Sequence, residues 1–195
     1  IYTLSLHDAL PILVIPEVAG FWLIYGKEKQ GKTWFSLKLA EHLSNYETTM
    51  YISAEQGTSK TFRDAYMRAQ LDPFNRRLKI VPYTEIAEIE NTLGKQRSSK
   101  VVIIDNTTIY KDELTAPKLR EWSRKYRNTL FIFLSHEEKG EPDLAVGRLC
   151  KKLAEIVIRV EGLACHVSGR CPGGTLVINE EKAQLYYDTN ITPNI

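Results

Sequence analysis

The sequence predicts an α/β fold with a mainly parallel sheet, flanked by helices and extended by antiparallel strands toward the C-terminus. From Phe21 to His136, short apolar runs alternate with amphipathic segments, and this order indicates a parallel sheet with helices on both faces. The run VVIID at 101–105 contains four β-branched residues in succession, which is typical of a strand covered on both faces. Beyond His136 the segments alternate like antiparallel hairpins, with turn signals at Gly162 and at 172–174.

The bounds of the expected elements follow from these patterns. Parallel strands are expected at 21–26, 49–55, 78–83, 100–106 and 129–136. Helices are expected at 32–46, 58–71, 85–94 and 116–128. Gly94 is expected to end its helix, since glycine tolerates the left-handed conformation common at that position. After these elements we expect a polar loop at 136–143 and a short helix at 144–154. Three antiparallel strands are expected at 154–162, 164–170 and 174–188.

Length and composition fit one globular domain. The chain has 195 residues, of which 43% are hydrophobic and 26% charged, and its formal net charge is +2. A chain of this length buries roughly 70% of the surface that it exposes when unfolded, so it needs no disulfide or metal to fold. The near-neutral charge argues against a polybasic protein but allows a local basic patch. We expect residues 13–195 to form a single domain.

The first dozen residues, IYTLSLHDALPI, read as translated adapter sequence from a sequencing library. We expect residues 1–12 to be a non-native or disordered leader, and an ordinary strand or leader before the core is the alternative. No segment has the ~18 to 20 uninterrupted apolar residues of a membrane span. The N-terminal stretch carries Asp8 and Glu17 and lacks the basic region of a signal peptide, so we expect no membrane association.

Three cysteines are present, which is a small and odd number: Cys150, Cys165 and Cys171. This usage favours free thiols in a reducing compartment over a disulfide framework, so we expect a cytoplasmic protein. A metal site built from Cys165, His166 and Cys171 is the alternative, although no paired CxxC or HxxxH spacing supports it.

The octapeptide GKEKQGKT at 26–33 has the pattern G-x-x-x-x-G-K-[ST] between an expected strand and an expected helix. Its glycines allow the backbone N–H groups to point at phosphates, Lys32 reaches the β and γ phosphates, and Thr33 presents a hydroxyl to Mg²⁺. The pattern predicts binding of ATP with Mg²⁺; a glycine turn with a solvated lysine is the alternative. The expected nucleotide-binding residues are Gly26, Lys27, Glu28, Lys29, Gln30, Gly31, Lys32, Thr33 and Trp34.

Two carboxylates follow expected strands. Asp105 ends the run VVIID, where a carboxylate lies beside the phosphate loop and can hold Mg²⁺ through water, so Thr33 and Asp105 are the expected metal-binding residues. The alternative for Asp105 is an Asx-turn with Asn106 and Thr107. Glu55 follows the second strand, where a carboxylate can orient or deprotonate the water that attacks the γ-phosphate; a solvated strand end is the alternative.

With these residues the sequence resembles the RecA-like P-loop ATPase superfamily, which includes recombinases, hexameric replicative helicases and circadian-clock type ATPases. The resemblance covers about Phe21 to Tyr187. GKEKQGKT is similar to the Walker A motif, VVIID to the Walker B strand, and YISAE to the strand that ends in the catalytic glutamate, here Glu55. The resemblance implies a RecA-like fold, ATP hydrolysis with Lys32 among the catalytic residues, and assembly into a ring or filament.

Two further catalytic roles are implied by the resemblance. FLSHEEKG resembles the strand end that carries a polar γ-phosphate sensor, here His136, for which a core or loop histidine is the alternative. The segment VSGRCPGGTLVINEEKAQLYY resembles the helicase-type hairpin whose basic residues reach the nucleotide of a neighbouring subunit. This implies an arginine finger at Arg170, and a water-facing arginine is the alternative. The companion lysine is replaced by Ser168, so one cation alone would stabilise the transition-state charge.

The resemblance also places two loops at a central pore that would hold DNA or RNA. The second loop is acidic, which repels a phosphate backbone, and its charged residues are Glu137, Glu138, Lys139, Glu141 and Asp143. The first loop offers Tyr110 for stacking and Lys111 for charge, offset by Asp112 and Glu113. The basic run Lys118, Arg120, Arg124, Lys125 and Arg127 is also consistent with a solvated helix face.

Two hypotheses of different classes follow. The first is an Mg²⁺-dependent ATPase that assembles into a homo-oligomer and acts on single-stranded nucleic acid in replication or recombination. The second is a slow nucleotide-dependent switch that recruits a protein partner, which the acidic loop and Ser168 favour. A small-molecule kinase is a third option, but the sequence has neither an arginine-rich lid nor an obvious acceptor pocket.

Overall fold

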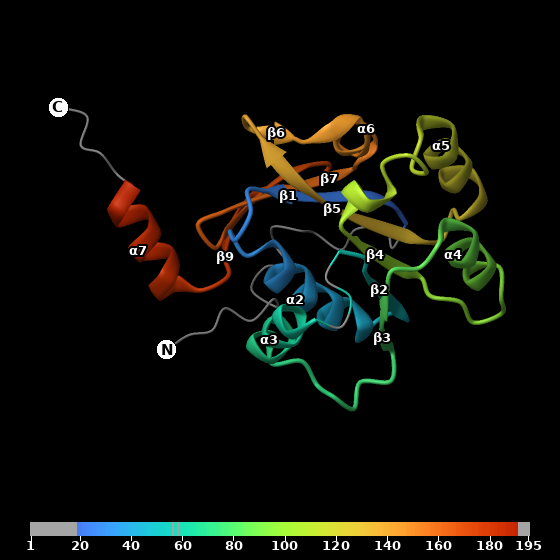
Figure 1. The fold of residues 1–195 in the computed structure, drawn as a ribbon, viewed down its shortest axis with the longest axis horizontal. Coiled ribbons are helices and arrows are strands. Elements are labelled where there is room, and N and C mark those ends of the chain that lie inside the picture. The colour runs from blue at the N-terminus through green and yellow to red at the C-terminus, as the bar shows by residue number, and fades with distance from the viewer. Residues whose placement is uncertain (1–18, 56, 58, 191–195) are drawn as a thin grey trace.

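The computed structural model describes residues 19–55, 57 and 59–190 (Figure 1). The expected leader at 1–12 lies outside these residues. The strands are β1 (Gly20–Gly26), β2 (Thr49–Ser53), β3 (Leu78–Pro82), β4 (Val101–Asp105), β5 (Leu130–Glu138), β6 (Glu141–Pro142), β7 (Ile156–Glu161), β8 (Ala164–Gly169) and β9 (Gly174–Val177). The helices are α2 (Lys32–Ser44), α3 (Lys60–Ala69), α4 (Ile86–Leu93), the 3₁₀ helix η2 (Thr107–Tyr110), α5 (Ala116–Lys125), α6 (Leu144–Leu153) and α7 (Glu180–Asn190).

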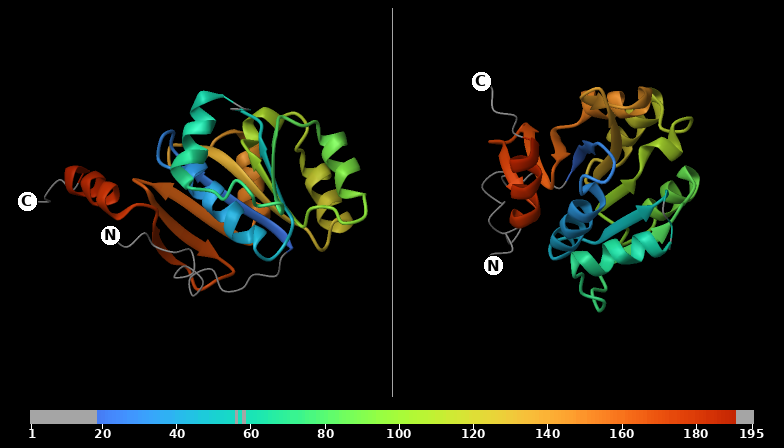
Figure 2. Two further views of the ribbon diagram at one scale, coloured as in Figure 1. Left: turned by 90° about the horizontal axis from the view of Figure 1, so that it is seen from below. Right: turned by 60° about the vertical axis from the view of Figure 1, so that its left-hand side comes forward.

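The strands form one mixed sheet in the order β3-β2-β4-β5-β1-β7-β8-β9, with β6 paired to β5. From β3 to β7 neighbouring strands are parallel, whereas β8 and β9 add antiparallel strands at one side (Figure 2). This arrangement confirms the predicted fold class. Because the parallel strands share one direction, their last residues lie at one end of the sheet, here called the carboxyl end. Their first residues lie at the opposite end, here called the amino end.

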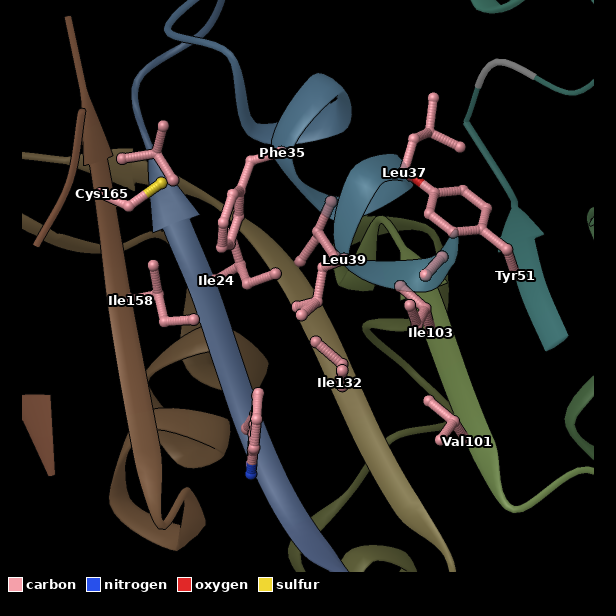
Figure 3. Close-up of a cluster of buried hydrophobic side chains, with 14 of the residues drawn as sticks. Ile24, Phe35, Leu37, Leu39, Tyr51, Val101, Ile103, Ile132, Ile158 and Cys165 are labelled. Carbon is pink, nitrogen blue, oxygen red and sulfur yellow. The ribbon is translucent and has the colours of Figure 1, made fainter. Parts of the chain in front are cut away.

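Helices cover both faces of the sheet, as the unbroken apolar strands predict. Alternate residues of each strand enter different cores, so that Trp22 and Ile24 of β1 lie on one face and Leu23 on the other. Helices α2 and α3 cover the first face, and α4, α5 and α6 cover the second (Figure 1). In the first core, Phe35 of α2 packs beside Ile24 (Figure 3).

The polar loop expected at 136–143 is instead a hairpin, which corrects the sequence-based prediction. Strand β5 continues through Glu138 and pairs with β6. The turn residues Lys139 and Gly140 have φ values of 53° and 83°. Positive φ at both positions matches the type I′ turn, whose twist suits a two-residue hairpin. The sequence did not indicate this strand end because its residues are polar and show no apolar alternation.

One other detail of the prediction is wrong. The segment after β9 is the helix α7, because Asn179 caps it through the N–H of Lys182 at 2.9 Å and acidic residues occupy its first turn. The apolar alternation within 174–188 was therefore a misleading signal. Gly94 ends α4, as predicted; it has the right-handed conformation, with φ −75°, and its N–H donates to the carbonyl of Glu90.

Within the described part of the chain, no helix is both long and apolar enough to cross a membrane. Cys150 and Cys165 are buried free thiols, and burial raises the pKa of Cys150 to about 12. The alternative metal site at Cys165, His166 and Cys171 does not form, since no group of three metal-ligating side chains gathers among the residues described.

Candidate nucleotide-binding site

The loop 26–33 connects β1 to α2 at the carboxyl end of the sheet, as the motif predicts. Gly26 lies against β7, where an added Cβ would overlap the carbonyl oxygen of Val160. Gly31 has φ 104°, a left-handed conformation that glycine adopts without strain. Among the residues that the structure describes, no side chain caps α2, so its first-turn N–H groups are available to an anion.

Lys32 lies inside the curve of this loop. Its Nζ donates to the carbonyl oxygens of Gly26 at 2.8 Å and of Lys27 at 2.7 Å. Burial lowers the pKa of Lys32, and the Asp105 carboxylate opposes this shift. The loop therefore holds a buried cation at its centre through neutral carbonyl groups, which is a favourable arrangement for an anionic ligand.

Asp105, at the end of β4, is buried and receives two hydroxyl hydrogen bonds. Thr33 Oγ1 lies 3.2 Å and the Tyr51 hydroxyl 2.7 Å from Asp105 Oδ2, and Ser36 Oγ lies 2.9 Å from the Tyr51 hydroxyl. Burial raises the pKa of Asp105, against these hydrogen bonds. The Asx contact considered for Asp105 belongs to Asn106, whose Oδ1 accepts from the N–H of Thr108 at 2.8 Å.

The ends of three strands meet beside this carboxylate. Glu55 follows β2, Asn106 follows β4, and His136 lies in β5. Asn106 Nδ2 donates to Glu55 Oε2 at 2.8 Å, and His136 Nε2 lies 3.5 Å from the same oxygen. The His136 side chain is 23% exposed and its Nδ1 is buried with no partner among the described residues. Glu55 is thus oriented by two neighbouring side chains, of which sequence reasoning missed Asn106.

These residues line one cleft of about 570 Å³ at the carboxyl end. Of the expected nucleotide-binding residues, the cleft is lined by Glu28, Lys29, Gly31, Lys32, Thr33 and Trp34. The helix α3 contributes Arg68, whose guanidinium carbon lies 5.9 Å from the centre of the Trp34 ring. Asp105, Glu55 and His136 complete the wall, so the structure brings together every predicted catalytic and metal-binding residue except Arg170.

The acidic hairpin is more neutral than its sequence indicated. Arg159 of β7 makes a bidentate pair with Glu137, at 2.8 and 3.0 Å, and also contacts Glu161 at 2.9 Å. The Glu137 side chain is only 1% exposed, and Arg159 lowers its pKa. Glu141 pairs with Lys151 at 2.7 Å. Partners from other elements therefore neutralise Glu137 and Glu141, whereas Glu138 and Asp143 form no ion pair among the residues described.

The phosphate loop is also tied to the C-terminal part of the fold. Gly162, in the turn between β7 and β8, donates its N–H to Gln30 Oε1 at 2.6 Å. The Tyr187 hydroxyl of α7 donates to the carbonyl of Glu161 at 3.1 Å. Gln30 thus holds the loop against the turn rather than lining the cleft, and α7 packs on the residue beside that turn.

Arg170 lies outside the cleft, and Tyr110 does not take the place that the sequence suggested. Arg170 follows β8 at the amino end of the sheet, its side chain is 83% exposed, and it lies 3.6 Å from Glu155. It therefore cannot line the cleft of its own chain. Tyr110 is fully buried and donates to the carbonyl of Thr84 at 2.7 Å, so its predicted stacking role is wrong.

Comparisons with known proteins agree with this geometry. The sequence profile of the iSTAND family, described as inactive STAND, matches residues 15–144. The DNA repair protein RadA of Aquifex aeolicus is 27% identical over 135 residues, which are 67% of this chain and 28% of RadA, so the chain spans only part of that relative.

Two solved structures share the fold. The flagellar accessory protein FlaH of Methanocaldococcus jannaschii is 16% identical with a TM-score of 0.62, over 90% of this chain and 93% of FlaH. A second structure, described as an ATPase domain, is 14% identical with a TM-score of 0.58, over 86% of this chain and 84% of that domain. The profile match covers most of the chain, and the sequence and structural likenesses all indicate one architecture. The chain therefore belongs to the iSTAND family and has the RecA-like P-loop fold.

Proposed function

We propose that the cleft binds ATP with Mg²⁺ and hydrolyses the γ-phosphate. The observation that carries this proposal is the convergence of Lys32, Asp105 and Glu55 from three separate strand ends on one cleft beside an uncapped helix N-terminus. A buried lysine, a buried carboxylate and an oriented carboxylate are the set that phosphoryl transfer to water requires.

The side chains present fit both ligands. Lys32 and the first-turn amides of α2 are donors for phosphate oxygens. Thr33 and Asp105 offer a hydroxyl and a carboxylate oxygen 3.2 Å apart, the hard oxygen donors that Mg²⁺ prefers when phosphates complete its shell. Trp34 and Arg68 offer an aromatic ring and a guanidinium plane on which a base can stack. When bound, Mg²⁺ supplies charge stabilisation for the transferring phosphoryl group.

Glu55 is the residue that we assign to the attacking water. Its carboxylate can accept the proton of that water while Asn106 fixes its orientation. His136, on the same oxygen, is placed to contact the γ-phosphate side of the cleft. The family description as inactive makes turnover the step to be tested separately from binding.

A nucleotide-dependent switch is the second candidate, and one observation favours it. Gln30 links the phosphate loop to Gly162, beside the residue on which α7 packs, so nucleotide binding can alter the contacts of α7. In this case ATP would bind tightly while turnover stayed slow, and α7 would present the partner surface.

Coupling to single-stranded nucleic acid and assembly into a homo-oligomer are part of the first proposal. The printed role of RadA as a DNA repair protein supports the coupling. The exposed position of Arg170, away from its own cleft, supports an oligomer, because that side chain can reach only the nucleotide of another subunit.

The test measures ATP binding by titration calorimetry and phosphate release in the same preparation. Lys32→Ala should weaken ATP binding about 10 to 100-fold, since it removes a charge-assisted contact. Glu55→Gln should keep binding and lower turnover about a hundredfold or more. Lys139→Ala, in the hairpin turn, is the matched control and should change neither. If ATP binds tightly but Glu55→Gln leaves turnover unchanged, the switch proposal replaces the ATPase proposal. If wild type and Lys32→Ala bind ATP equally well, both proposals are rejected.

A further inference from the structure

The amino end of the sheet, opposite the cleft, carries a strip of cations, most of them exposed. The loops that lead into β3, β4 and β5, with the end of α5 and the residue after β8, contain Arg76, Arg77, Lys95, Arg97, Lys100, Arg124, Lys125, Arg127 and Arg170. The acids at this end include Glu47, Asp72 and Glu155; Glu41 accepts from the Asp72 N–H, and Glu90 and Glu121 lie near Lys125. Among the residues described, no carboxylate pairs with Arg76, Lys95, Arg97 or Arg124, and all four are exposed.

The loops of this strip are fixed side by side by the backbone. Thr49 donates its N–H to the carbonyl of Arg77 at 2.8 Å, and Lys100 donates to the carbonyl of Thr48 at 2.8 Å. Leu130 donates to the carbonyl of Lys100 at 2.8 Å. The loops before β3, β4 and β5 therefore follow the strand order β3-β2-β4-β5, in which neighbouring strands lie about 4.8 Å apart, and the loop before β2 carries Glu47.

Two exposed aromatic rings lie at the β3 side of the strip. Phe74 is 86% exposed and Tyr46 is 57% exposed. The Phe74 loop is held by side chains on both sides: Asp72 Oδ1 accepts from the Phe74 N–H at 2.9 Å, and Asn75 Nδ2 donates to Ser44 Oγ at 2.7 Å. Arg77 donates to the carbonyl of Tyr46 and so ties the two aromatic segments together.

We infer that this strip binds single-stranded nucleic acid. Cations in a line satisfy a phosphate backbone, and rings held in solvent offer stacking surfaces for unpaired bases, which is the combination that sequence-tolerant single-strand binding uses. The inference rests on the proposed coupling to nucleic acid, and it moves the contact from the pore loops to the amino end. It also agrees with the burial of Tyr110, which removes a stacking ring from the carboxyl end.

The test is fluorescence anisotropy of labelled oligo(dT) of about 20 nucleotides, long enough for the strip, at low salt and without ATP. Phe74→Ala should weaken binding about tenfold through lost stacking. Arg97→Ala should weaken it about fivefold and reduce the salt slope by about 0.7. Met67→Ala, an exposed apolar residue of α3, and Lys139→Ala, at the carboxyl end, should each stay within about twofold of wild type. Thermal unfolding should be unchanged in all four variants.

Three outcomes would overturn the inference. One is no binding of oligo(dT) by wild type. Another is loss of binding in Lys139→Ala or Lys111→Ala with full binding in Phe74→Ala and Arg97→Ala. The last is that polyglutamate competes as strongly as unlabelled oligo(dT) does and that Phe74→Ala has no effect. This result would indicate a surface that binds acidic proteins. Lys32→Ala, which lies in the cleft, should bind oligo(dT) as wild type does. The failure of the ATPase proposal can therefore be distinguished from the failure of this inference.

Discussion

The two ends of the sheet hold their charged side chains in different ways. At the carboxyl end, Lys32, Asp105 and Glu137 are buried or nearly so, and each is fixed by hydrogen bonds to named partners. At the amino end, Arg97 and Arg124 project into solvent without a carboxylate partner among the described residues. Fixed charges are suited to positioning a reaction, because they need no reorganisation, whereas exposed cations are suited to a mobile polyanion. One sheet can therefore hold the proposed nucleotide site at one end and the proposed nucleic-acid surface at the other.

Asp105→Asn, at the carboxyl end, is expected to have the largest effect on turnover. Loss of the carboxylate should lower Mg²⁺-dependent phosphate release about a hundredfold, because a bound metal ion supplies several kcal/mol of stabilisation. Asp64→Asn, an exposed acid that lines the same cleft from α3, is the control and should keep turnover. Equal turnover in the two variants would contradict the metal role of Asp105.

The same substitution should stabilise the protein in the absence of nucleotide. Burial raises the pKa of Asp105 above 3.8, so the folded protein holds this proton more tightly than the unfolded chain does. The free energy of unfolding of wild type therefore falls as pH rises through the window above 3.8, and the uncharged amide of the variant avoids that cost. Thermal melts from pH 4 to 7 should show that the melting temperature of Asp105→Asn exceeds that of wild type by a difference that widens with pH. A difference that is constant or reversed would count against the buried charge.

The second effect concerns the ion pair behind the hairpin. Arg159→Gln leaves the Glu137 carboxylate, 1% exposed, without its main partner, and should cost about 2 kcal/mol; a larger value is not expected because Arg159 itself is partly exposed. Arg148→Gln, on the exposed side of α6, is the control. The double variant with Glu137→Gln should recover much of the loss. Urea unfolding measures all three.

The pH dependence of this pair has the opposite sign to that of Asp105. Arg159 lowers the pKa of Glu137 below 4.5, so the pair contributes stability that is complete above pH 4.5 and is lost as pH falls through the lowered pKa. The difference between wild type and Arg159→Gln should therefore shrink on acidification. A difference that persists at the lowest pH would show that Arg159 acts by packing alone.

The sequence predicted the parts of the site that lie within one segment. The glycine and lysine spacing at 26–33 and the carboxylate that ends VVIID depend on local chain geometry, and both take the expected places. Tyr51, Asn106 and Arg159 were missed because their partners are 22 to 54 residues away, and contact depends on strand order. The α7 helix could have been predicted from Asn179 and the acids that follow it, because a helix cap is a stronger signal here than the apolar alternation of the same segment.

The smallest effect on stability is expected at Arg170, whereas its effect on turnover tests whether the two ends meet between subunits. Its pair with Glu155 is long and exposed, so Arg170→Ala should leave the melting temperature unchanged. If Arg170 reaches the nucleotide of a neighbour, Arg170→Ala and Lys32→Ala lack different halves of a shared site. Mixed in equal amounts, the two variants should then recover about a quarter of wild-type turnover, since random head-to-tail contacts pair an intact loop with an intact arginine in that fraction. Full turnover in Arg170→Ala alone, at concentrations where the wild type is oligomeric, would show instead that this arginine faces water and that each chain works with its carboxyl end alone.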